Sequence, residues 1–177
     1  NFTNMIPLEY EVDRLKEIFM EMVELVRDQF TLTKEALLTG DVETAGEVMR
    51  KEGRVNSYEL NIDRECEDFL ALQAPVAADL RLAIAILKMS ASLERLGDHA
   101  YRICSFLYDD EVKFRKDLIK LIQLAELFDE IDDMLRIVIE AFETGDAKLA
   151  KQVFKKDKKL DKINKKVPEL LQGYYKD

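Results

Sequence analysis

Hydrophobic positions follow a helical period along almost the whole chain. Between Leu8 and Leu38, apolar residues recur every three or four positions, as they do on the buried face of an amphipathic helix. The same pattern returns four times, and it predicts further helices over residues 42–72, 75–109, 116–143 and 147–168. The pattern therefore predicts an all-α protein.

A turn signal at the end of the first predicted helix is repeated later in the chain. Gly40 supplies a helix stop, and Asp41 is a natural N-cap for the next helix. A shift of 105 residues aligns this turn with Gly145 and Asp146, and flanking residues recur at Ala141, Thr144, Ala150, Val153 and Lys156. The repeat predicts two copies of a helical unit.

We therefore expect tandem three-helix bundles, with the first over residues 1–112 and the second over residues 113–177. The second bundle is expected to lack its last helix in this chain, because only two helices are predicted after residue 113. Pro75 is expected to begin the third helix, and Pro168 to kink or end the fifth. Nine Pro and Gly residues among 177 leave few tight turns, which argues against an all-β fold.

Charge is distributed unevenly along the chain. Ten lysines and five acidic residues lie in 146–177, whereas residues 1–145 contain 17 basic and 31 acidic residues, a net charge of −14. Nucleic-acid phosphates would be repelled by this main body, so we expect no nucleic-acid binding. The lysines of the tail are interpreted as a solvated helix face, although they could reach an anion. Cys66 and Cys104 have no CxxC spacing and are expected to be buried thiols.

Two lines of residues follow the third predicted helix with alternating steps of four and three. The first is apolar throughout and is expected to be the core seam: Leu82, Ile86, Met89, Leu93, Leu96, Ala100, Ile103 and Leu107. The second begins with Leu80, Ile84, Leu87 and Ala91, and then reaches Glu94 and Asp98. Like charges one turn apart disfavour a helix by about 0.2–0.5 kcal/mol unless a cation lies between them.

The second predicted helix has the same feature. Glu52 and Glu59 interrupt an otherwise apolar line that contains Ala45, Val48, Val55, Ile62, Cys66 and Phe69. The corresponding line of the second copy carries Asp157. Oxygen ligands from adjacent helices would suit a hard or borderline cation such as Mg²⁺, Mn²⁺ or iron. The alternative is a set of solvated acidic pairs, which are common in a chain this rich in carboxylates.

An enzyme finds little support in the residue pattern. His99 is the single histidine, it lies five residues after Glu94, and it is expected at the surface or between helices. Di-iron bundles need two Glu-x-x-His pairs, and nucleophilic triads need a histidine beside a nucleophile turn. The chain also has no glycine-rich phosphate loop. We therefore predict a protein that acts by binding.

Several segments in order resemble the PhoU family of phosphate-signalling regulators. They are Glu52-Gly53-Arg54-Val55-Asn56, Asn61-Ile62-Asp63-Arg64, Leu70-Ala71-Leu72-Gln73, Pro75-Val76-Ala77-Ala78-Asp79-Leu80-Arg81 and Leu93-Glu94-Arg95-Leu96-Gly97-Asp98-His99-Ala100. The resemblance implies two three-helix bundles and a cytoplasmic negative regulator of phosphate uptake and phosphate-starvation signalling. It also implies two partners, the ATPase subunit of a phosphate transporter and a sensor histidine kinase.

The resemblance further implies metal binding at an acidic signature of Glu or Asp, three residues, then Asp. In this chain the signature falls on Glu52 and Asn56, on Glu94 and Asp98, and on Asp157 and Asp161, with Asn56 standing where the family has Asp. The implied cofactor is iron, zinc, manganese or magnesium. A homodimer without direct membrane insertion is also expected. The alternative is a helical scaffold or metal-binding bundle in a pathway unrelated to phosphate.

Overall fold

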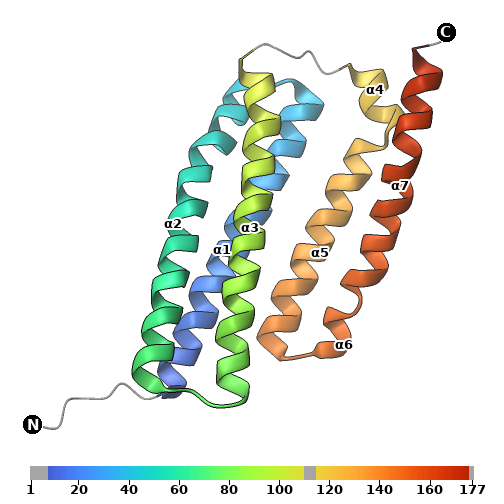
Figure 1. Ribbon diagram of the computed structural model, residues 1–177. Coiled ribbons are helices and arrows are strands. Elements are labelled where there is room, and N and C mark those ends of the chain that lie inside the picture. Colours follow the sequence, from blue (N-terminus) through green and yellow to red (C-terminus); the bar gives the residue numbers. More distant parts are fainter. Residues whose placement is uncertain (1–7, 110–114, 176–177) are drawn as a thin grey trace, which may run out of the picture. The chain divides into compact units, whose positions relative to one another are not determined.

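The computed structural model describes residues 8–109 and 115–175. Within these ranges the chain forms helices joined by turns, and no strand is present, which confirms the all-α prediction (Figure 1). The helices are α1 (Leu8–Thr39), α2 (Val42–Gln73), α3 (Ala78–Tyr108), α4 (Lys116–Leu121), α5 (Leu124–Thr144), α6 (Ala147–Ala150) and α7 (Val153–Tyr174). None of these helices is long and apolar enough to cross a membrane.

The two Gly-Asp turns have the same local structure. Gly40 and Gly145 both adopt left-handed backbone, with φ of 76° and 67°, which glycine tolerates without a steric penalty. The carboxylate that follows each glycine then caps the next helix: Asp41 accepts from the backbone N–H of Glu43, and Asp146 from those of Lys148 and Leu149. The duplicated turn predicted from the sequence is therefore confirmed.

The connection between α2 and α3 differs from the prediction. Pro75 does not begin the third helix, which starts at Ala78 instead. Ala74 and Ala77 have left-handed backbone, with φ of 45° and 47°, and this conformation is incompatible with a right-handed helix. The chain therefore reverses over residues 74–77 before it can continue as α3.

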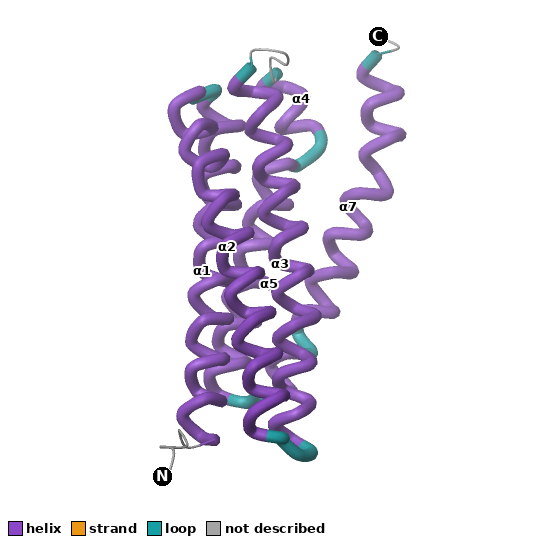
Figure 2. The backbone as a smooth tube through the Cα atoms, turned by 60° about the vertical axis from the view of Figure 1, so that its left-hand side comes forward, coloured by secondary structure: helices purple, strands orange, loops and turns teal. Residues whose placement is uncertain are grey.

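Two predicted helices are each divided in the structure. Gln123 is left-handed, with φ of 54°, and it separates α4 from α5 where one helix over 116–143 was expected. A turn at residues 151–152 similarly separates α6 from α7 (Figure 2). Pro168 lies inside α7 and does not end it. A proline removes only one backbone donor, and the helix continues around it to Tyr174.

The residues form two compact units. Unit 1 contains Leu8–Val26 and Arg50–His99, and unit 2 contains Arg27–Met49 together with the described residues after His99. Helices α1, α2 and α3 each contribute residues to both units. The two compact units therefore do not coincide with the two copies of the helical repeat predicted from the sequence. The predicted boundary between residues 112 and 113 lies outside the described residues.

Each unit has its own apolar core. In unit 1 the buried side chains include Phe19, Met22, Val23, Val55, Ile62, Cys66, Phe69 and Ile86. In unit 2 they include Phe30, Leu37, Val48, Cys104, Ile119, Phe128, Leu135 and Ile137, and the rings of Phe30 and Phe128 lie 5.8 Å apart. Both cysteines are buried as predicted, and burial raises the pKa of the Cys66 thiol to about 11.

The buried face of α3 is rotated relative to the predicted seam. It consists of Ala83, Ile86, Ser90, Leu93, Gly97, Ala100, Cys104 and Leu107. Ile86, Leu93, Ala100 and Leu107 were predicted, but Leu82, Met89, Leu96 and Ile103 are only half-buried. The second predicted line lies at the surface at Leu80, Ile84 and Ala91. Small residues on the buried face let neighbouring helices approach, so Ser90 and Gly97 occupy core positions.

Candidate functional site

Carboxylates from α2 and α3 meet in unit 1. Glu59 is half-buried and lies on the α2 line between the buried residues Val55 and Ile62, as the sequence predicted. Burial raises its pKa, and the charges of Glu94 on α3 and Asp63 on α2 raise the pKa further. Glu59, Asp63 and Glu94 are called the α2–α3 acidic group below.

No cation neutralises the α2–α3 acidic group within the part of the chain that the structure describes. None of its three carboxylates forms an ion pair with a residue in 8–109 or 115–175. Their mutual repulsion is therefore uncompensated, and it is the direct cause of part of the pKa shift at Glu59. Such a group favours the approach of a positive charge from outside these helices.

Among the predicted ligands on α2, Glu52 and Asn56 lie together. Both are half-buried, and the Asn56 side-chain amide donates a hydrogen bond to Oε1 of Glu52. The amide therefore occupies one carboxylate oxygen that a metal would otherwise use. Asn56 acts here as a hydrogen-bond donor to its neighbour, one turn away on the same helix.

The other four predicted ligands lie on two helices. Glu94 and Asp98 are half-buried one turn apart on α3, in unit 1. Asp157 and Asp161 are exposed on α7, in unit 2. Over residues 8–109 and 115–175, no three His, Cys, Asp or Glu side chains are grouped so that they could hold a metal ion. The donor types suit a hard cation, but no ligand set is assembled, and metal binding stays a prediction.

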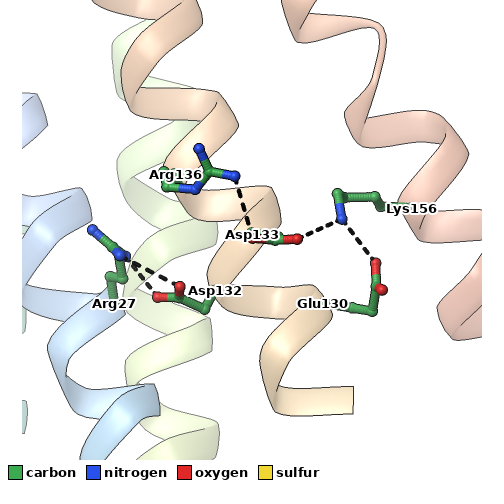
Figure 3. Close-up of polar contacts among 6 residues, drawn as sticks. All are labelled: Arg27, Glu130, Asp132, Asp133, Arg136 and Lys156. Carbon is green, nitrogen blue, oxygen red and sulfur yellow. Dashed lines mark hydrogen bonds and ion pairs between the residues drawn. The ribbon is translucent and has the colours of Figure 1, made fainter. Parts of the chain in front are cut away.

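A second set of carboxylates, on α5, is neutralised by lysines. Lys156 of α7 lies 2.7 Å from Oδ2 of Asp133 and 3.1 Å from Oε2 of Glu130 (Figure 3). Lys159 contacts the other oxygen of Glu130. Hydrogen bonds from Lys159 and Lys156 lower the pKa of Glu130, and those from Lys156 and Arg136 lower the pKa of Asp133. These four residues, Glu130, Asp133, Lys156 and Lys159, are called the α5–α7 ion-pair cluster.

An adjacent side of α5 makes further ion pairs with α1 inside unit 2. Arg27 Nε lies 2.6 Å from Oδ1 of Asp132 (Figure 3). Lys34 Nζ lies 2.6 Å from Oδ1 of Asp129. Four acidic residues of α5 thus face cations of two different helices. The role of these carboxylates is to hold helices together, and none of them was singled out from the sequence.

One shallow groove lies between α1 and α2 in unit 1. Its volume is about 450 Å³, and its lining includes Ile18, Glu21, Arg54 and Tyr58. The Tyr58 hydroxyl donates to Glu21 at 3.0 Å, and burial together with this carboxylate raises the pKa of Tyr58. His99 is exposed on α3, as predicted, and does not line this groove.

Comparison with known proteins shows the same fold and sequence pattern. The PhoU domain matches residues 19–107 and 124–174. The phosphate-specific transport system accessory protein PhoU of Edwardsiella tarda is 32% identical over 164 residues, which are 93% of this chain and 67% of that protein. The protein of the same name from Escherichia coli K12 is 30% identical over 164 residues, again 93% of this chain and 67% of that protein.

Solved structures agree with this assignment. PhoU from Pseudomonas aeruginosa superposes with a TM-score of 0.85 at 29% identity, over 95% of this chain and 80% of that one. The phosphate transport system regulatory protein PhoU from Streptococcus pneumoniae has the same fold, with a TM-score of 0.84 at 24% identity, over 97% of this chain and 80% of that one. These two sequence relatives are about 1.4 times as long as this chain, since the same 164 residues are 93% of the chain and 67% of each relative. Taken together, the helical repeat, the matched domain and these relatives show that the chain belongs to the PhoU family.

Proposed function

We propose that this protein is a cytoplasmic negative regulator of phosphate uptake and phosphate-starvation signalling. It would act by contacting the ATPase subunit of a phosphate transporter and a sensor histidine kinase, so that its output is binding rather than turnover. The names of its relatives, an accessory protein and a regulatory protein of phosphate transport, support this role. A homodimer is part of the proposal, with light scattering of the purified protein as its test.

The observation that carries the proposal is the α2–α3 acidic group. Three carboxylates with no cationic partner among the described residues form a surface that a basic partner can neutralise. Complementary charge of this kind sets the association rate and the specificity of a protein contact more than its affinity. Glu94 belongs to this group and is also a predicted metal ligand, so one position serves both parts of the proposal.

The test compares two double variants. Glu94→Ala plus Asp98→Ala removes two half-buried carboxylates of α3, and Glu140→Ala plus Glu143→Ala removes two exposed carboxylates of α5 as a control. Each variant is expressed in a cell that lacks its own family member, and a phosphate-responsive reporter is measured. We expect the α3 variant, with its helical circular dichroism retained, to lose restraint of the reporter, and the control to keep it. Full restraint by the α3 variant would refute a regulatory role for this site.

Metal content is measured on the same purified proteins. Elemental analysis is expected to find iron, zinc, manganese or magnesium in the wild type and in the α5 control, and to find less in the α3 variant. A metal-free wild type that still restrains the reporter would remove the metal from the proposal and leave the protein contact in place.

A further inference from the structure

Helices α6 and α7 carry a basic surface that the acidic site does not explain. Residues 147–175 contain nine lysines, three acidic residues and no arginine. Eight of these lysines are exposed: Lys148, Lys151, Lys155, Lys158, Lys159, Lys162, Lys165 and Lys166. The ninth, Lys156, is half-buried in the α5–α7 ion-pair cluster. The exposed lysines are called the basic face.

The opposite side of α7 is apolar and half-buried. Its residues follow steps of three and four: Val153, Lys156, Leu160, Ile163, Val167 and Leu170. Lys156 is the one charged residue in this stripe, and it contacts α5, which lies beside α7 in unit 2 (Figures 1 and 3). The packing of α7 on α5 therefore fixes which side is turned away from the helix pair, and that side is the basic face.

Most of the basic face makes no ion pair inside the molecule. Apart from Lys159, none of its lysines pairs with a residue that the structure describes. Asp161 lies one turn from both Lys158 and Lys165, yet it pairs with neither. The lysines therefore stay unpaired even where a carboxylate lies within reach on the same helix. They form a set of positive charges on one side of α7 that no described carboxylate neutralises.

An exposed aromatic side chain accompanies these lysines. Phe154 is 67% exposed, although phenylalanine is usually buried in a folded protein. It lies beside Lys155 and one turn from Lys151 and Lys158. Clustered lysines near an anionic lipid surface each strengthen binding several-fold, and an exposed aromatic ring among them adds a contact with the headgroup layer.

The absence of arginine separates a lipid surface from a protein partner. Protein interfaces are enriched in arginine and depleted in lysine, because the planar guanidinium makes paired hydrogen bonds and sheds water easily. Lysine is a hydrated point charge that suits a diffuse layer of anions. We propose that the basic face docks this protein on the surface of an anionic lipid bilayer, with Phe154 entering the headgroup region. This inference is independent of the proposed function.

The test is co-sedimentation of the full chain with lipid vesicles at low salt. One set is phosphatidylcholine alone, and in the other phosphatidylglycerol replaces a third of the phosphatidylcholine. The first variant is Lys158→Glu plus Lys162→Glu plus Lys165→Glu. The matched control, Lys88→Glu plus Lys116→Glu plus Lys120→Glu, changes the net charge equally at exposed lysines elsewhere.

We expect the wild type to bind the anionic vesicles and not the neutral ones. The α7 variant should bind about 100-fold more weakly, because each lysine near an anionic surface contributes several-fold to partition, and the control should bind within a few-fold of the wild type. Phe154→Ala should weaken binding several-fold with all lysines present. Circular dichroism establishes that every variant is folded.

Three outcomes would overturn the proposal. The first is a wild type that stays in the supernatant when anionic vesicles are sedimented at low salt, even if it binds an acidic protein. The second is an equal loss in the α7 variant and the control, which would make net charge rather than the basic face responsible. The third is equal binding to neutral and anionic vesicles.

Discussion

The α2–α3 acidic group and the α5–α7 ion-pair cluster are both rich in carboxylates, but their electrostatics are opposite. In the first, Glu59 has a raised pKa because it is desolvated and faces other carboxylates. In the second, Glu130 and Asp133 have lowered pKa values because lysine and arginine side chains donate to them. The carboxylates that hold α5 against α7 are paired with lysines of the same protein. An acidic group without cations instead costs stability, because the repulsion between its carboxylates is not offset.

The largest expected effect is on the ion-pair cluster. Glu130→Ala should lower the free energy of unfolding by about 1–2 kcal/mol, because half-buried Lys156 and exposed Lys159 lose a shared partner. The measurement is urea unfolding followed by circular dichroism. Glu140→Ala, on the exposed side of the same helix, should change the free energy by less than about 0.5 kcal/mol. Equal effects of the two variants would contradict a structural role for the cluster.

Lys156→Met should have an effect of about 1 kcal/mol that depends on pH. The lowered pKa values of Glu130 and Asp133 mean that their stabilisation is present above the unfolded pKa values, near 4, and is lost as pH falls through the folded ones. The stability difference between variant and wild type should therefore shrink below about pH 4. A difference that stays constant from pH 7 to pH 3 would show that packing alone is responsible.

Glu59→Gln should act in the opposite direction and more weakly. A carboxyl whose folded pKa is raised destabilises the fold once pH exceeds its unfolded pKa, because the folded state ionises less readily. We expect the variant to be more stable at pH 7 by about 0.5 kcal/mol, and equal to the wild type well below pH 4.5. Glu67→Gln, an exposed carboxylate on the same helix, should change little at either pH. A destabilised Glu59→Gln protein would refute the repulsion.

Salt should produce the smallest change. At 1 M NaCl the screening length is about 3 Å, so exposed charges interact weakly beyond direct contact. The part of the Glu59→Gln gain that comes from repulsion by Glu94 and Asp63 should disappear, and the larger part that comes from burial should remain. The loss from Glu130→Ala should persist in part, since its hydrogen bonds are direct contacts. If 1 M NaCl abolished the loss from Glu130→Ala and left the gain from Glu59→Gln unchanged, the roles assigned to the α5–α7 ion-pair cluster and the α2–α3 acidic group would be wrong.

The sequence predicted helices well where the signal is local. The first two end within one residue of their expected ends, and Gly40 with Asp41 makes the expected turn. The left-handed residues Ala74, Ala77 and Gln123 were missed, because alanine and glutamine are ordinary helix formers. On α3, Ser90 and Gly97 belong to the buried face, and a pattern of large apolar residues could not include them.

The candidate site was predicted in part for a similar reason. Glu59 stood out because it interrupts a buried line on one helix, and that line is local in sequence. Glu130 and Asp133 did not, since their lysines lie 23 to 29 residues away along the chain. Arg27 and Asp132 are separated by 105 residues. Such pairings depend on how helices pack, which periodicity within one helix does not encode.

The duplicated Gly-Asp turn also bears on how fast the chain can fold. Each turn closes by hydrogen bonds between residues five or fewer positions apart, from Gly40 to Ala36 and from Asp146 to Ala141. Closing so short a loop takes well under a microsecond, and a helical hairpin seeded there needs no distant segment. Chains dominated by local contacts of this kind cross the folding barrier in microseconds to milliseconds. The two reversals therefore give the chain two separate places at which folding can start.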